Sequence, residues 1–277
     1  MYYHHALLIG LILFAVGCAR DAPEAPAAPE EPVTSRQEEV SFVHAVLASM
    51  IDLSEQGLLR SGQATTVLTG EALTRWEMDT FGQAEAEIGM IQLLGPDRAA
   101  ARIVFSDDDR RTDCYFYLVR EESWKVRAMR SMALTDLLQK VLDELDAGPD
   151  RPEDADSIRD NIVLTLSTDA ELRAWFGRNR PSLERLVAAA QPELEPGARG
   201  IVDDDGVHAE IEAMLGDLNL QSVSLTRTGN VEIIIGGVID NTVGFLYAPA
   251  DEPPGIDPAS YIWVEKLADG WYLFRTT

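Results

Sequence analysis

Histidine, cysteine and basic residues are scarce in this sequence of 277 residues, and each scarcity excludes a class of function. Only 4 residues are His and 2 are Cys, so sites that need several such ligands or nucleophiles have little to draw on. Lys and Arg number 23 against 47 Asp and Glu, which gives a net charge of −24. Because polyanions repel so acidic a chain, we expect no nucleic-acid partner and no docking on anionic lipid.

Long apolar runs are missing as well. Residues 6–15 are uncharged and apolar, but a segment of about a dozen residues covers only roughly 18 Å, against roughly 30 Å for the hydrocarbon core of a bilayer. The run is therefore too short for a membrane-spanning helix. Its length and its small closing residues are typical of a secretory signal peptide.

Ala15-Val16-Gly17-Cys18 closes this run and resembles the lipobox of bacterial lipoproteins. In that family the Cys receives a diacylglyceryl group and the signal is cut immediately before it. The resemblance implies a signal peptide over residues 1–17 and a lipid bilayer as the partner of acylated Cys18. Ala19 lacks the Asp that favours inner-membrane retention, which implies an outer-membrane anchor facing the periplasm.

Two features depart from the lipobox pattern. Ala15 replaces the commoner Leu, and the first five residues contain no Lys or Arg. An ordinary secretory signal, or a start codon upstream of the real one, remains an alternative. The following residues, 18–34, are dominated by Ala, Pro and Glu, which predicts a disordered tether because such a segment buries too little apolar surface to fold.

Residues 35–147 are predicted to form an α+β domain. Ser35-Arg36-Gln37-Glu38 is a capping-box pattern that opens a helix, and a second helix is expected at 71–81. The spacing of the apolar residues then changes to that of strands, which are expected at residues 88–94, 99–105, 114–119 and 124–132. A closing helix is expected at residues 135–145. This order, with Trp124-Lys125-Val126 opening the last strand, resembles the cone-shaped fold of nuclear transport factor 2-like proteins.

A polar, proline-containing segment at 148–154 predicts a boundary, followed by a second α+β domain over 156–277. A strand is expected at 161–166, then helical residues that Pro181 kinks or divides into two helices, then a helix at 207–215. Mainly antiparallel strands follow, ending in a β-hairpin, at residues 222–227, 231–235, 243–247, 261–267 and 271–275. Leu183-Glu184-Arg185-Leu186-Val187 and the terminal Asp269-Gly270-Trp271-Tyr272 resemble a loosely defined group of bacterial proteins of unknown function.

Motifs for catalysis are absent from the sequence. It has no nucleophile elbow, phosphate loop, dinucleotide fingerprint or zinc spacing, and we therefore predict no cofactor and no metal. The acidic runs 107–109 and 203–205 lack the ligand order of a calcium loop and are interpreted as solvated turns. Cys114 lies in a β-rich run without a nearby His, so a small buried hydrophobe is favoured over a reactive thiol.

His44 and His208 are the histidines of the expected mature chain. His44 shares a helical face with Val40 and Leu47, which favours a half-buried side chain over a general base. The pattern at His208, with Glu212 four residues later, is ordinary helix-surface pairing.

Four arginines flank Trp175 and Phe176 and form the one cationic stretch of an acidic body. Arg178 and Arg180 beside Trp175 could recognise an anionic group such as a lipid headgroup or a peptide carboxylate. A solvated helix face whose arginines pair with local acids is the favoured alternative.

Two functions remain open from the sequence. The first is a non-enzymatic envelope lipoprotein, a binding or assembly module facing the periplasm whose partner is an envelope protein or an anionic envelope component. The second is a small-molecule binder or enzyme that uses a pocket in the first domain lined by His44. A concave pocket that contains His44 and a carboxylate such as Asp52 or Glu77 would favour the second, and a filled interior the first.

Overall fold

The fold is taken from a computed structural model that describes residues 35–59, 62–74, 84–107, 110–132, 135–147, 152, 154–197, 209–238 and 241–276. Residues 36–277 form one compact unit. The expected signal peptide, Cys18 and the tether lie outside the described residues, so these predictions stay open. Among the described helices, none combines the length and apolarity that a membrane crossing requires.

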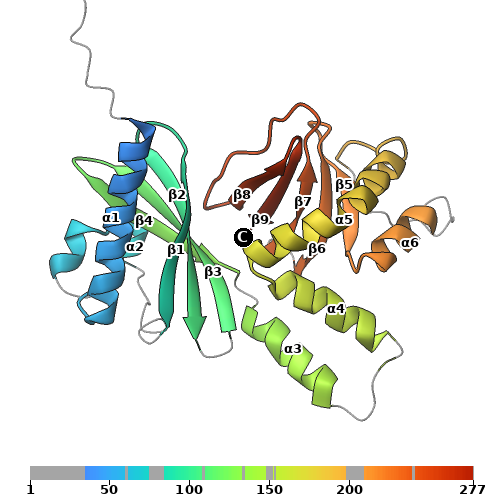
Figure 1. The fold of residues 1–277 in the computed structure, drawn as a ribbon, viewed down its shortest axis with the longest axis horizontal. Coiled ribbons are helices and arrows are strands. Elements are labelled where there is room, and N and C mark those ends of the chain that lie inside the picture. Colours follow the sequence, from blue (N-terminus) through green and yellow to red (C-terminus); the bar gives the residue numbers. More distant parts are fainter. Residues whose placement is uncertain are drawn as a thin grey trace, which may run out of the picture. The chain divides into compact units, whose positions relative to one another are not determined.

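A four-stranded antiparallel sheet and a long helix make up the first half of this unit (Figure 1). The helix is α1 (Arg36–Glu55), followed by a 3-10 turn (Gly62–Thr66) and the short α2 (Gly70–Thr74). The sheet order is sequential, and the strands are β1 (Glu85–Leu93), β2 (Arg98–Asp107), β3 (Arg110–Arg120) and β4 (Trp124–Ser131). The four predicted strands are confirmed, whereas most of the second predicted helix lies outside the described residues.

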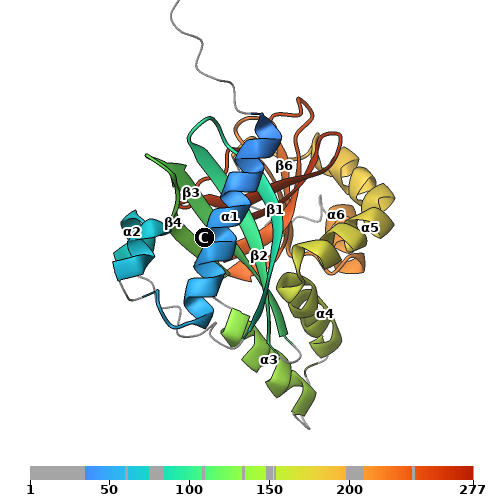
Figure 2. The same ribbon diagram turned by 60° about the vertical axis from the view of Figure 1, so that its left-hand side comes forward.

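Each face of this sheet is covered by a different layer. Val43, Leu47 and Met50 of α1 are fully buried against one face, in a core that includes Phe116 and the free, buried Cys114. The buried position predicted for Cys114 is confirmed, and burial raises the pKa of its thiol to about 12. Figure 2 shows α1 lying across the sheet. The opposite face carries alternate residues of the same strands, which follows from the two-residue period of a β-strand.

A five-stranded antiparallel sheet forms the second half, in the order β5-β6-β7-β9-β8. Its strands are β5 (Ser222–Leu225), β6 (Val231–Val238), β7 (Asn241–Tyr247), β8 (Tyr261–Ala268) and β9 (Trp271–Thr276). The helices that accompany it are α3 (Thr135–Ala147), α4 (Ala155–Leu166), α5 (Asp169–Ala190) and α6 (Ala209–Asp217). The α+β class with two antiparallel sheets is therefore confirmed, including the terminal β8–β9 hairpin.

The structure corrects one local prediction and decides against one alternative of another. Residues 161–166 belong to α4 and not to a strand, because the apolar run is short and its pattern continues a helix that begins at Ala155. Of the two alternatives predicted at Pro181, two separate helices are excluded, since α5 continues for 22 residues with Pro181 inside it. Its start is a capping box, in which the Thr168 side chain accepts from the Glu171 backbone N–H and the Glu171 side chain accepts from the Thr168 backbone N–H.

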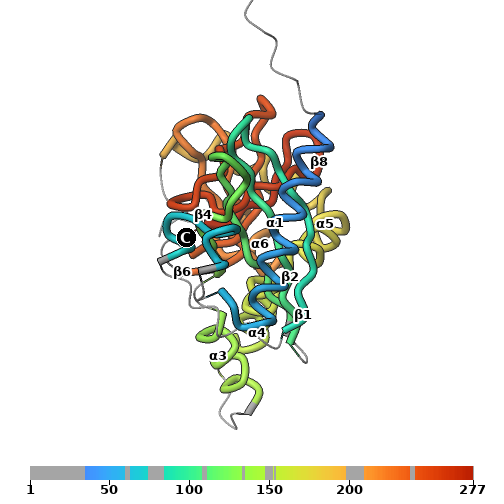
Figure 3. Tube along the Cα trace, turned by 90° about the vertical axis from the view of Figure 1, so that its left-hand side faces the viewer, coloured from blue at the N-terminus to red at the C-terminus, as the bar shows by residue number. Residues whose placement is uncertain are grey.

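The two sheets meet through the face of the first sheet that α1 does not cover. Tyr115 and Tyr117 of β3 pack with Ile262 and Trp263 of β8, and the Tyr115 and Trp263 rings stack with centroids 5.1 Å apart. The Tyr117 hydroxyl donates to the Ile262 carbonyl at 2.5 Å. Beside this contact α3 lies next to α4, as the trace in Figure 3 shows. The predicted boundary at 148–154 stays a prediction.

Candidate functional site

A groove of about 730 Å³ runs beside α1. Its α1 wall includes Glu39, Phe42, Val46, Ser49 and Leu53, which recur every three or four residues and so share one helix face. At 1.5 Å per residue this stripe is about 21 Å long. The opposite wall comes from Thr66 and Val67 and from the turn between β3 and β4, at residues Arg120, Glu122, Ser123 and Trp124.

Glu39 joins the two walls at one end of the groove. Its carboxylate accepts hydrogen bonds from Arg120 Nη1 at 2.7 Å and from Trp124 Nε1 at 2.8 Å. These bonds hold the β3–β4 turn against the first turns of α1 and keep the Trp124 indole, which is 5% exposed, at the groove wall. Arg120 and Glu39 neutralise each other there.

The surface of the groove is apolar with an acidic rim. Phe42 is 57% exposed, the largest exposure among the large apolar side chains of the described residues. Asp52 and Glu122 line the rim, and neither carboxylate has a hydrogen bond or ion pair with any residue that the structure describes. The groove thus offers apolar contact area and two negative charges that no described residue compensates.

The structure does not bring His44 into this groove. His44 is exposed on α1 and is not a lining residue, so the prediction of a half-buried imidazole is wrong. The reason is that the buried face of α1 carries Val43 and Leu47. His44 follows Val43 directly in the sequence, so the helical turn places its side chain away from that face. Asp52 does line the groove, whereas Glu77 and His208 lie outside the described residues.

The arginine stretch on α5 is divided among different contacts. The Trp175 ring stacks on the Phe245 ring, with centroids 5.5 Å apart and planes 7° apart. Trp175 therefore packs against the second core, the hydrophobic core that α5 and α6 form with the five-stranded sheet. Arg180 Nε donates to Glu184 Oε1 at 2.8 Å, the local pairing that the alternative interpretation expected. Arg178 is exposed and lines, with Trp175, a separate hollow of about 410 Å³. An anionic ligand at Arg178 and Arg180 stays a prediction.

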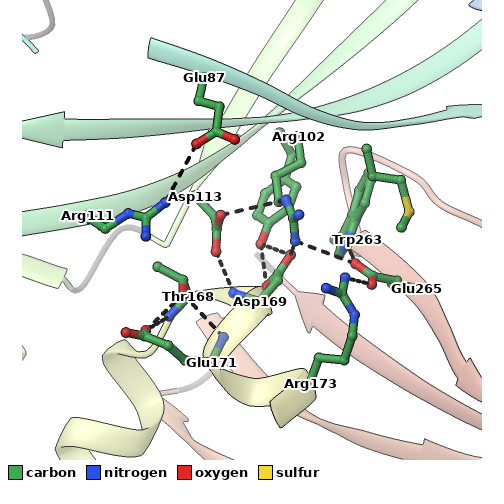
Figure 4. A network of polar contacts seen from close by, with 12 residues as sticks. Glu87, Arg102, Arg111, Asp113, Thr168, Asp169, Glu171, Arg173, Trp263 and Glu265 are labelled. Atoms are coloured by element: carbon green, nitrogen blue, oxygen red, sulfur yellow. Dashed lines mark hydrogen bonds and ion pairs between the residues drawn. The ribbon is translucent and has the colours of Figure 1, made fainter. Parts of the chain in front are cut away.

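A buried ionic network between the two sheets was not predicted (Figure 4). Asp169, the first residue of α5, is its centre: the Asp169 carboxylate accepts from Arg275 Nε at 2.9 Å and from the Tyr115 hydroxyl at 3.0 Å. Arg102 of β2 places Nη1 3.3 Å from Asp169 and 3.6 Å from Glu265 of β8.

Further contacts complete this network. The Asp169 backbone N–H donates to Asp113 Oδ2 at 2.7 Å, and Arg173 forms an ion pair with Glu265. Asp113, Asp169 and Glu265 thus meet three arginines, and the formal charges balance.

The formal charges of the network balance, while Arg102 Nε and Nη1 and Asp113 Oδ1 lie at ion-pair distances without a hydrogen bond to the residues that the structure describes. Burial and the charge of Asp169 raise the pKa of Asp113 to about 6. Burial alone would lower the pKa of Arg275, but Tyr115, Asp169 and Asp113 raise it by more, so Arg275 stays charged. A small cavity of about 20 Å³ beside Asp113 and Arg275 has room for about one water molecule.

A sequence signal for this network existed. Arg102 interrupts a run of apolar strand residues, and Glu265 and Arg275 each follow one directly. Charged residues are rarely buried unless they are paired. What the sequence alone could not give is their partner, because the pairing depends on how the two sheets meet. Among the described residues, no group of three or more potential ligands is arranged to hold a metal ion.

Comparison with known proteins gives no relative: no family model, no curated protein and no solved structure matches this chain.

Proposed function

We propose that this chain is a lipid-anchored, non-enzymatic binding module of the bacterial envelope, and that the groove beside α1 is its binding surface. The observation that carries the proposal is the groove itself. Ligand sites are usually concave and mostly apolar, with volumes of about 300–1,000 Å³ and a few placed polar groups. The groove has this form, with Phe42, Val46 and Trp124 in its walls.

The polar groups of the groove favour binding over catalysis. Glu39 is occupied by Arg120 and Trp124, and the described residues of the lining include no His or Cys to act as a general base or nucleophile. The interior between α1 and the sheet is filled by Val43, Leu47 and their neighbours, which supports a surface module over an enzyme with an enclosed site. A small-molecule ligand in the same groove is the second candidate, and the groove volume supports it.

An uncharged dye tests the binding surface. Residues 36–277 form a compact unit whose described cores are built from its own residues, so this soluble part is the protein to use. We expect Nile red to gain fluorescence with this protein and Phe42→Ser to weaken dye binding about tenfold, as loss of a central aromatic contact does. Leu137→Ser is the matched control, because Leu137 is 53% exposed on α3 and does not line the groove. Equal dye binding by both variants would contradict the proposal.

The lipobox supports the membrane anchor. In the full-length chain, Cys18→Ser is expected to leave unprocessed precursor and to abolish labelling by a fatty-acid analogue. A wild-type protein that takes up no label, with a mature amino terminus elsewhere, would overturn this part of the proposal and leave the groove untouched.

A further inference from the structure

We infer that the groove beside α1 takes a basic amphipathic segment of another protein, laid along the groove with its apolar side chains inward. This inference rests on the proposed function and adds the chemistry of the occupant. Its basis is the length of the apolar stripe together with the charge of the rim.

The length of the groove suits a peptide segment. The stripe from Glu39 to Leu53 extends about 21 Å along α1, which matches about 14 residues of helix at 1.5 Å per residue. Amphipathic helices bind such grooves through apolar side chains at positions i, i+3, i+4 and i+7. The exposed Phe42, followed by Val46 and Leu53, provides apolar contacts at matching intervals.

The charge of the rim selects a basic segment. Asp52 and Glu122 are exposed carboxylates without partners among the described residues, while Arg120, which also lines the groove, is paired with Glu39. A ligand that carries Lys or Arg beside its apolar face would compensate both carboxylates. The net charge of −24 adds long-range attraction for cations, and the same charges oppose a fatty acid or another anionic amphiphile.

Two synthetic peptides separate these contributions. Both have 16 residues and carry Leu at helical positions i, i+3, i+4 and i+7, with Lys at the remaining positions of one and Glu at those of the other. With the soluble protein of residues 36–277, we expect the Lys peptide to bind at least tenfold more tightly than the Glu peptide in isothermal titration calorimetry. Phe42→Ser should weaken the Lys peptide about tenfold, whereas Leu137→Ser should leave its affinity within about twofold.

A charge-matched pair of variants then locates the attraction. Asp52→Asn/Glu122→Gln should weaken the Lys peptide about fivefold, because each exposed pair contributes little but both face the groove. Glu193→Gln/Glu195→Gln removes the same number of charges from exposed positions that do not line the groove, and is expected to change affinity less than twofold. Equal weakening by the two double variants would show attraction to the whole protein and would overturn the inference.

The remaining outcomes distinguish the inference from the proposed function. If both peptides bind equally and Phe42→Ser weakens both, the groove binds apolar segments without a charge preference, so the inference fails and the proposed function stands. If neither the peptides nor Nile red depend on Phe42, both fail. Thermal unfolding of each variant near the wild-type temperature confirms that the comparison is made on folded protein.

Discussion

Asp169 Oδ1 accepts a hydrogen bond from Arg275 Nε at 2.9 Å, and the two side chains are 0% and 6% exposed. The pair links the first residue of α5 to the last strand of the chain, and through Arg102 and Tyr115 it reaches the other sheet. A buried ion pair contributes little net stability compared with a well-packed apolar pair, but it fixes which groups meet. We expect this pair to fix the start of α5 beside β9.

Removing one member of the pair should be costly. We predict that Arg275→Leu lowers the free energy of unfolding by about 3–5 kcal/mol, because it leaves Asp169 buried with one charge partner fewer. Arg180→Leu, which breaks the exposed pair with Glu184, should cost at most about 0.5 kcal/mol. Urea denaturation of both variants measures their free energies of unfolding. Equal losses would mean that the buried pair contributes no more to stability than the exposed Arg180–Glu184 pair.

Asp113 should make stability depend on pH in an unusual direction. Its pKa is raised from 3.8 to about 6 in the folded protein, so the folded state binds a proton more tightly than the unfolded state does. Protonation therefore stabilises the fold: this contribution is complete below about pH 4 and is lost as the pH rises through about 6. Relative to Asp113→Asn, the wild-type protein should gain unfolding free energy as the pH falls from 7 to 4. A relative loss over that range would show that the arginines outweigh burial and the charge of Asp169.

Gly236 of β6 tests the position of α4. A Cβ atom added at Gly236 would lie 2.0 Å from Thr165 Oγ1 and 3.1 Å from Asn161 Oδ1, both on α4. Gly236→Ala should therefore destabilise the protein by about 1–3 kcal/mol through overpacking. Gly216→Ala on α6 is the control, because nothing lies within 4 Å of its added Cβ and alanine favours a helix.

A second substitution shows whether the Gly236 effect comes from contact with α4. If Thr165 is the obstacle, Gly236→Ala/Thr165→Ala should lose less stability than the sum of the two single losses. Strict additivity in thermal unfolding would place the steric conflict elsewhere.

The strands were predictable because their pattern is local. Short runs of apolar, β-branched and aromatic residues such as Ile103, Val104 and Phe105 favour strands, and turn residues separate one strand from the next. The helix α4 was not predictable with the same argument. Its run Ile162-Val163-Leu164 is too short to show either period, and β-branched residues favoured the wrong one.

The candidate sites were harder to predict than the elements that carry them. Trp124 was recognised as the residue that opens β4, but its place in a groove depends on the hydrogen bond to Glu39, which lies 85 positions earlier. Two acidic members of the ionic network, Asp113 and Asp169, belong to no motif in the sequence. They come together only because the two sheets pack against each other. His44 is one of only 4 histidines, but the scarcity of a residue type does not indicate where its side chain points.

The measurement that tests the central claim most directly is the indole signal of Trp124. In 15N-labelled residues 36–277, titrated with hexan-1-ol as a small uncharged apolar probe, the Trp124 Nε1–H resonance should shift and saturate, because this group lies in the groove wall and donates to Glu39. The indole of Trp271, which is 1% exposed in the second core, should not move, and Phe42→Ser should weaken the response of Trp124. A Trp124 signal that stays fixed while another indole shifts would contradict the claim that the groove beside α1 is the binding surface.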